Sequence, residues 1–237
     1  MVAEQRMHAA RWRRRKAARP SEILAAALAA FVERGFAATR LDDVARRAGV
    51  TKGTLYLYFP NKAELFKAVV AQAVVPSIER GEAKLESAAA SGAVVLEQLM
   101  RGWAEVARSP AGAIPKIIVA EAGNFPDLAR FYQHEVVDRG MAVFRRVLRI
   151  GVERGEFRAV DIDNAALCLV APLLLAMLWR HSLGRHARGG FDPDTLCATL
   201  LDLLLHGLAA PPAMPAAPNT DQPPVARAAG IKEKAPS

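Results

Sequence analysis

The stretch from Thr39 to Lys62, TRLDDVARRAGVTKGTLYLYFPNK, constrains the fold of this chain more than any other. Its first half predicts a short amphipathic helix, because apolar residues recur there at helical spacing. Gly49 can take the positive φ at which a helix stops, and Thr51 is a suitable N-cap for a second helix. The stretch therefore predicts two short helices joined by a tight turn. The apolar positions of the first are Leu41, Val44, Ala45 and Ala48.

The second of these helices carries few residues that a core would need. It displays small, hydroxylated and basic side chains, which suit a DNA groove and its phosphates. The pair is therefore interpreted as a helix-turn-helix whose second helix reads DNA. The side chains in question are Lys52, Gly53, Thr54, Tyr56 and Tyr58.

The run VTKGTLYLYFPNKAELF, with the apolar helix SEILAAALAAFVERGF and Thr39 before it, resembles the DNA-binding domain of the TetR/AcrR family of bacterial transcriptional regulators. The resemblance covers roughly residues 21–68, where helix lengths, the turn and several residues agree in order and spacing. Those residues are Gly49, Tyr56, Phe59 and Lys62. Many members of the family carry His at the position of Leu57, and an apolar side chain there suggests contact with a thymine methyl or a sugar.

The resemblance and the pattern together give a set of expected DNA contacts. Lys62, Tyr56 and Tyr58 are expected to meet phosphates, while the exposed centre of the second helix meets base edges. Because one such helix reads only a few base pairs, a dimer on a palindromic operator is expected. The whole predicted set is Thr39, Arg40, Thr51, Lys52, Gly53, Thr54, Tyr56, Leu57, Tyr58 and Lys62.

Charge is distributed unevenly along the chain. Residues 1–67 hold 14 Lys/Arg against 6 Asp/Glu, whereas residues 68–237 hold 18 of each. The formal net charge of +8 therefore lies entirely in the N-terminal part, as expected of a nucleic-acid reader with a separate neutral domain.

Composition argues against an enzyme, a metal protein or a cofactor protein. Cys168 and Cys197 are the two cysteines, and both are expected to be reduced, buried thiols. No Cys/His cluster, Gly-rich phosphate loop, HExxH or GxSxG motif is present, so no metal site, cofactor or catalytic residue is predicted. Residues 165–179 form an uncharged run of 15 residues with Pro172 inside it, too short to span a bilayer, and predict a buried helix.

The predicted fold is all-α. A disordered basic arm (1–20) precedes the helix-turn-helix domain (21–67), and a helix beginning at Asn61 joins it to an effector-binding and dimerisation domain (68–210). From about Leu85 onward, breaks near 109–110, 123–126, 155–163 and 184–193 delimit five helices. The Pro/Ala-rich residues 211–237 are expected to be a disordered tail.

Two helical stretches near the C-terminus, residues 165–179 and 196–208, are apolar on all sides. Such helices must be covered on all sides, so they predict a homodimer interface. Their alternative use is as the core of the monomer. The predicted interface residues are Leu167, Val170, Leu174, Met177, Leu200 and Leu204.

An apolar effector pocket is expected in the middle of the chain, lined by aromatic and aliphatic side chains. Aromatic residues at helical spacing are equally typical of an ordinary core. Glu121, Arg180 and His134 are candidates to orient a polar group of the effector. The predicted lining is Met100, Trp103, Ile118, Phe125, Phe131, Tyr132, His134 and Trp179.

These observations predict a cytoplasmic, ligand-responsive transcriptional regulator, most simply a repressor. It would bind double-stranded DNA as a homodimer, respond to a small apolar or aromatic effector, and make no use of a membrane. The alternatives are an effector-independent regulator or activator, and a helical binding module without specific DNA recognition.

Overall fold

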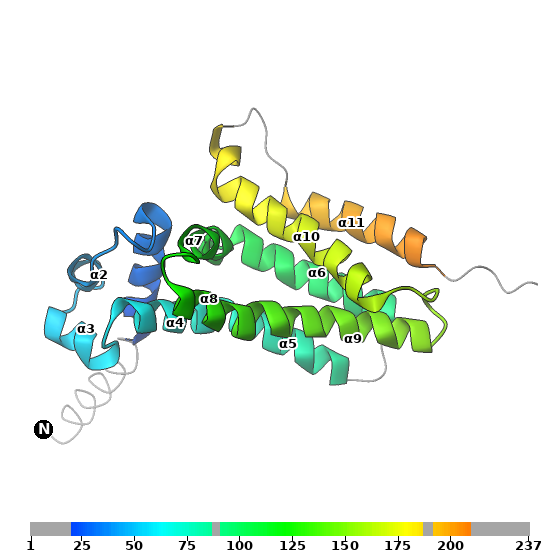
Figure 1. Cartoon of the computed structure of the whole chain (residues 1–237), viewed down its shortest axis with the longest axis horizontal. Helices are drawn as coiled ribbons and strands as arrows, with labels where there is room; N and C mark the ends of the chain where they lie inside the picture. The colour runs from blue at the N-terminus through cyan, green and yellow to red at the C-terminus, as the bar shows by residue number, and fades with distance from the viewer. Residues whose placement is uncertain (1–19, 87–90, 187–191, 210–237) are drawn as a thin grey trace, which may run out of the picture.

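The computed structural model describes residues 20–86, 91–186 and 192–209. These residues are helical apart from short connections, which confirms the all-α prediction (Figure 1). The expected arm, except for Pro20, and the expected tail lie outside the described residues. The first helix spans residues 20–34, and the others are α2 (Leu41–Arg47), α3 (Lys52–Tyr58), α4 (Lys62–Ala73), α5 (Val75–Glu86), α6 (Gly92–Arg108), α7 (Ile114–Glu121), α8 (Pro126–Tyr132), α9 (Arg139–Glu153), α10 (Ile162–His181) and α11 (Pro193–Leu208).

The helix-turn-helix forms as its local sequence dictates. Gly49 has a φ of 65° and ends α2, and the Thr51 hydroxyl caps α3 by accepting a hydrogen bond from the Thr54 amide at 3.1 Å. Asn61 caps α4 in the same way through the Glu64 amide. Val75 begins α5 one residue after α4 ends, and Pro76 lies in the first turn of α5, where its missing N–H costs no helical hydrogen bond.

The larger domain contains the five helical stretches that the breaks predict. The third of them is α8, a π-helical turn (Gln133–Asp138) and α9 in one continuous run. α6 contacts both α9 and α11, while α10 lies along α9. In Figure 1, α10 and α11 form one side of this domain, and the N-terminal helices sit at the opposite end from the start of α10.

The structure has two hydrophobic cores, and the first does not stop at the expected domain boundary. It joins the N-terminal helices to α4, through Val69 and Val70, and also to α7 and α8 through Ile114 and Leu128. The second core lies among α5, α6, α9, α10 and α11. Helices α7 and α8 are therefore packed onto the N-terminal helices.

Candidate DNA-binding site

The recognition helix α3 is anchored by Leu55, with Tyr58 half-buried against the same core, and it exposes the opposite side. Leu55 is fully buried, whereas Leu57 is 80% exposed and Tyr56 is 42% exposed. Gly53 is also exposed, and a Cβ added to it would meet only the Thr51 hydroxyl oxygen, at 3.9 Å. The outward side of α3 is thus open for a DNA groove, as predicted from the sequence.

The polar groups of α3 are engaged with one another and with α2. The hydroxyls of Thr51 and Thr54 lie 2.8 Å apart and hydrogen-bond. The Lys52 ammonium pairs with the Asp42 carboxylate at 3.0 Å and lies 5.9 Å from the centre of the Tyr56 ring. The hydrogen bond to Asp42 raises the pKa of Lys52, so this side chain stays protonated. Lys52 keeps at least one further N–H donor, and whichever threonine hydroxyl accepts keeps its own O–H, so these bonds orient the polar groups of α3 without using all of their donors.

Lys62 differs from its expected role as a phosphate contact. Its ammonium donates to the carbonyl oxygens of Phe36, Ala37 and Thr39 at 2.8, 2.8 and 3.2 Å. An ammonium has three N–H donors, and all three are used here. Partial burial lowers the pKa of Lys62. Lys62 therefore fastens the loop after the first helix to the start of α4.

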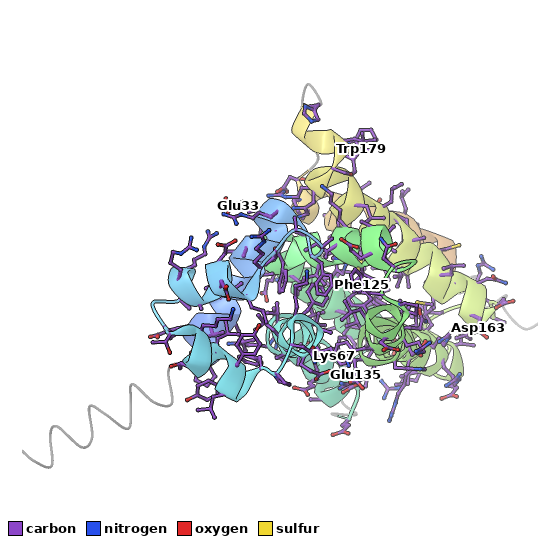
Figure 2. The ribbon with its side chains drawn as sticks, turned by 60° about the vertical axis from the view of Figure 1, so that its left-hand side comes forward. Glu33, Lys67, Phe125, Glu135, Asp163 and Trp179 are labelled. Carbon is purple, nitrogen blue, oxygen red and sulfur yellow. The ribbon has the colours of Figure 1, made fainter. Side chains whose placement is uncertain are left out.

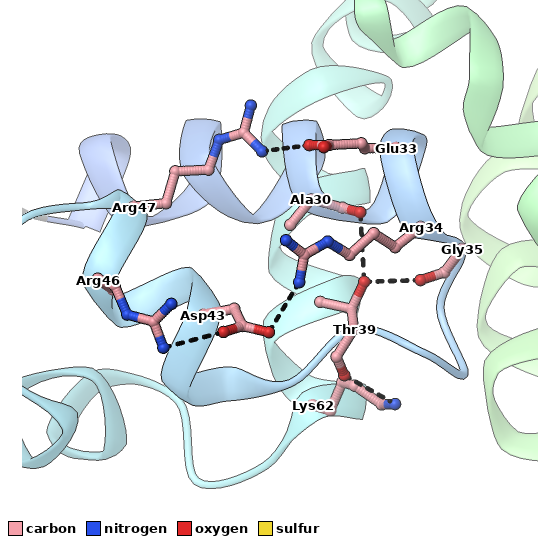
Figure 3. A network of polar contacts seen from close by, with 9 residues as sticks. All are labelled: Ala30, Glu33, Arg34, Gly35, Thr39, Asp43, Arg46, Arg47 and Lys62. Carbon is pink, nitrogen blue, oxygen red and sulfur yellow. Dashed lines mark hydrogen bonds and ion pairs between the residues drawn. The ribbon is translucent and has the colours of Figure 1, made fainter.

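Thr39 is likewise structural in this fold. Its side chain is 2% exposed, and its hydroxyl lies 2.6 Å from the Gly35 carbonyl and 3.3 Å from that of Ala30 (Figure 3). The single O–H of Thr39 is directed at these two carbonyls, with the shorter contact to Gly35 just beyond the end of the first helix. The expectation that the Thr39 side chain meets DNA is therefore wrong.

The basic side chains of the folded N-terminal domain are mostly neutralised. Residues 20–67 hold seven Lys/Arg and five Asp/Glu. Arg34 and Arg46 both pair with Asp43, and Arg47 pairs with Glu33 (Figure 3). Lys52 and Lys67 also have carboxylate partners.

One basic side chain of this domain stands apart. Arg40, exposed at the N-cap of α2, makes no ion pair or hydrogen bond with its side chain among the described residues. It is therefore the guanidinium best placed to take a phosphate.

A joint between the two parts of the chain lies at the loop that Lys62 holds. The Phe36 ring is packed against Phe31, Phe66 and Phe125, with centroids 5.6, 5.4 and 4.8 Å away, and the Lys62 ammonium lies 4.6 Å from its centre. The Glu121 carboxylate at the end of α7 accepts a hydrogen bond from the Ala37 amide at 3.1 Å. Figure 2 places Phe125 between the N-terminal helices and the rest of the molecule. We call this cluster, Phe36, Ala37, Lys62, Glu121 and Phe125, the domain joint.

The residues predicted to line an effector pocket are not brought together. Ile118, Phe125, Phe131 and Tyr132 belong to the first core, whereas Met100 and Trp103 belong to the second. His134 is exposed and lies 3.1 Å from Asp138, and Trp179 is exposed at the far end of α10 (Figure 2). Burial raises the pKa of Tyr132, as expected of a core tyrosine. The sequence pattern thus selected core residues from two separate clusters. Glu121, a candidate to orient the effector, instead accepts a hydrogen bond at the domain joint.

The outer side of α10 and α11 is an apolar surface, which we call the α10/α11 face. It is formed by large apolar side chains that remain exposed in the described chain: Leu167, Leu174, Leu175, Trp179 and Leu203. Leu175 and Leu203, 62% and 64% exposed, are members that the sequence analysis missed. The predicted Met177 is 5% exposed and faces inward, and Val170, Leu200 and Leu204 are half-buried against the second core.

Two expectations about α10 therefore change. Cys168 is exposed, so the prediction of two buried thiols holds for Cys197 alone. Burial raises the pKa of Cys197 to about 11, which keeps it an unreactive thiol. By length and composition alone, α10 is apolar and long enough to cross a membrane. Only 28% of its most apolar 18-residue stretch is buried, so the helix is largely exposed and not the buried helix that the sequence predicted.

Within the described ranges no cluster of three or more His, Cys, Asp or Glu side chains suits a metal ion. The site's features are thus an open recognition helix, an exposed guanidinium at the start of α2, and an apolar face on α10 and α11.

Comparison with known proteins agrees with this geometry. Residues 23–69 match the family described as bacterial regulatory proteins, tetR family, and residues 95–187 match the tetracyclin repressor-like C-terminal domain. The chain is 30% identical to the HTH-type transcriptional regulator YfiR of Bacillus subtilis over 149 residues, 60% of this chain and 70% of that protein. It is 26% identical to the HTH-type transcriptional repressor KstR2 of Rhodococcus jostii, over 83% of this chain and 94% of that one.

The fold is also shared with a solved structure, the transcriptional regulator FadR of Bacillus subtilis in complex with stearoyl-CoA. The TM-score is 0.67 at 20% identity, covering 79% of this chain and 98% of that one. The proteins of this family that the chain resembles are transcriptional regulators and not enzymes. The chain therefore belongs to the TetR family of bacterial transcriptional regulators.

Proposed function

We propose that this protein is a cytoplasmic, effector-responsive repressor that binds a palindromic operator as a homodimer. The single observation that carries the proposal is the outward side of α3, which is open and uncovered while Leu55 fixes the helix to the core. A short helix held by one side, with the other side uncovered, is what major-groove reading requires.

Homodimer formation is supported by the α10/α11 face. Leucine side chains exposed on two adjacent helices form a contiguous apolar surface of the kind that marks an interface. A second copy covers it best, because the same surface on both copies is self-complementary under two-fold symmetry. Two recognition helices then address half-sites about 34–36 Å apart, one turn of DNA.

Repression is proposed to be relieved through the domain joint. α7 and α8 share a core with the DNA-reading helices, and the joint ties the end of α7 to the loop before α2. An effector that displaces α7 or α8 would change the position of the loop and of α2. The effector weakens operator binding only if it binds the state with displaced helices more tightly than the state that binds the operator. A tenfold loss of operator affinity needs a coupling free energy of about 1.4 kcal/mol.

The effector is proposed to be a largely apolar molecule, such as a long-chain acyl derivative. The second core of the larger domain offers mainly aliphatic and aromatic side chains, and its helix α10 also contacts α7, which links it to the domain joint. FadR of Bacillus subtilis, which has the same fold, was solved with stearoyl-CoA bound. Apolar sites with a few polar groups suit such ligands.

The test is selection of bound genomic fragments by the purified full chain, followed by binding of the best fragment at several salt concentrations. We expect an enriched inverted repeat, bound by two protomers with a steep dependence on salt. Stearoyl-CoA and stearate, added separately, should release the fragment if the effector is an acyl derivative. Uniform binding without an enriched motif would overturn operator recognition, and an enriched motif unaffected by any acyl ligand would overturn only the effector class.

A further inference from the structure

The centre of the reading surface of α3 has no hydrogen-bonding side chain. Helical residues are spaced roughly 100° apart, so Gly53 and Leu57, two residues before and after Leu55, each point about 160° away from the core. Tyr56 and Thr54 lie at about 100° on either side. Exposure agrees, since Leu57 is the most exposed large apolar side chain of the described residues.

The two central positions differ in what they can do. Gly53 has no side chain, so the helix backbone comes close to whatever it faces. Leu57 projects beyond it as an isobutyl group that the described part of the chain leaves 80% exposed. An exposed leucine beside an open glycine gives a smooth apolar stripe on the side of α3 that enters the groove.

The neighbouring polar groups do not replace a hydrogen-bonding centre. The Thr51 and Thr54 hydroxyls bond each other, and Lys52 is paired with Asp42. In the major groove the C5-methyl of thymine is the one apolar group that a base pair presents. A sugar contact fits the edges of the helix better than its centre, because the sugar-phosphate chains form the walls of the groove.

We propose that Leu57 reads a thymine methyl group in each operator half-site and so sets a thymine preference at that position. This inference rests on the proposed operator binding and deepens it by naming the chemical group that is read. Leu57 distinguishes thymine from cytosine and uracil because only thymine has a C5-methyl group to bury against the isobutyl side chain.

The test uses the selected operator with each thymine replaced in turn by deoxyuridine, which removes the methyl and keeps every hydrogen bond. For the wild-type chain, replacing thymine by deoxyuridine at one symmetric position should lower the affinity about fourfold per half-site. This is the effect of burying about one methyl group. Leu57→Ala should bind thymine and uracil operators equally at that position, with an unchanged salt dependence. Because Leu57 is exposed, this variant should keep the wild-type melting temperature.

Two results would overturn the proposal while leaving operator binding intact. One is a wild-type protein that tolerates uracil at every position of an operator it binds specifically. The other is a Leu57→Ala protein that keeps the full uracil penalty, which would mean that another residue touches the methyl. Tyr56→Ala is the matched control, and it should keep the uracil penalty because Tyr56 lies at the edge of the reading surface. If no operator is found at all, the proposed function fails.

Discussion

Phe125 meets Phe36 edge-on, with ring centroids 4.8 Å apart and planes at 77°. Phe36 lies in the loop before α2, and Phe125 lies in the turn between α7 and α8, 89 positions later in the chain. Aromatic pairs of this geometry contribute about 0.5–1.5 kcal/mol beyond the area that they bury. The contact therefore makes the two domains one packed unit at this point.

Phe125→Ala should weaken that unit and its coupling to DNA. Phe125 is half-buried, so we expect a loss of about 2 kcal/mol in the free energy of unfolding, below the range for a fully buried phenylalanine. Because coupling is reciprocal, operator binding to the wild type should slow amide exchange in α7, and the variant should lose this effect. Exchange measured by mass spectrometry with and without operator checks both.

The control for this variant is Phe131→Ala. Phe131 is half-buried in the same core and does not stack on Phe36. It should lower stability to a similar extent and keep the DNA-dependent protection of α7. Equal loss of protection in both variants would show that coupling does not pass through the domain joint.

Lys62→Met should destabilise the fold without changing the dependence of DNA binding on salt. The change removes three charge-assisted hydrogen bonds to loop carbonyls, and we expect a loss of about 2–3 kcal/mol. Chemical denaturation measures it. Lys67→Met, on the same helix but paired at the surface with Glu64, should cost less than about 1 kcal/mol. An unchanged stability with a shallower salt dependence would instead place Lys62 on a phosphate.

Arg40→Gln should leave stability unchanged and make DNA binding less dependent on salt, the opposite of the result expected for Lys62→Met. Arg40 is exposed and its side chain makes no contact within the described part of the chain, so stability should be unchanged. If each protomer loses one phosphate contact, the slope of log affinity against log salt should become shallower by about 2 for a dimer. Fluorescence anisotropy between low and moderate salt measures this slope. Arg101→Gln, on α6, is the control and should leave it unchanged.

Local sequence was sufficient for the helices and the turn. Gly49 and Thr51 act where a stop and a cap were expected, and Asn61 caps the helix that was expected to begin there, because capping depends on a few neighbouring residues. The reading surface of α3 also followed from spacing, since one anchor residue fixes the orientation of a short helix. These parts of the site were predictable for that reason.

Long-range partners were not predictable in the same way. The roles of Lys62 and Glu121 depend on a loop 23–26 and 84 positions away in sequence, respectively. Helical spacing likewise cannot tell which of two cores an aromatic residue enters, and the residues predicted for one pocket are divided between the two cores. α10 has apolar residues on every side, so periodicity did not show that Met177 faces inward and Leu175 outward.

Arg139→Gln should lower stability in a pH-dependent way. Arg139 joins α9 to α5 through two hydrogen bonds to Glu82, of 3.0 and 2.8 Å, and the pairing lowers the pKa of Glu82 below its ordinary value of 4.5. A lowered carboxyl pKa adds stability that is complete above pH 4.5 and is lost as pH falls through the lowered value. Because Glu82 is partly exposed, we expect at most about 1 kcal/mol at pH 7.

Thermal unfolding of both proteins from pH 7 to pH 3 checks this prediction. The difference in melting temperature between the wild type and Arg139→Gln should become smaller below pH 4.5. Arg130→Gln, which removes a well-exposed pair with Asp127 within α8, should show no measurable gap at any pH. A gap that widened toward acid would contradict the assigned role of the Glu82 carboxylate.

Leu175→Glu should separate the protomers of the proposed dimer. Leu175 is 62% exposed on the α10/α11 face, so the substitution should leave the folded monomer intact. In a dimer the new carboxylate would be buried without a partner, which costs far more than the lost leucine contact. Sedimentation should then show monomers at concentrations where the wild type is dimeric, and operator affinity should fall more than tenfold because only one half-site is held at a time. Val137→Glu, exposed but outside this face, should remain dimeric and bind the operator normally, and a dimeric Leu175→Glu protein would exclude the α10/α11 face as the interface.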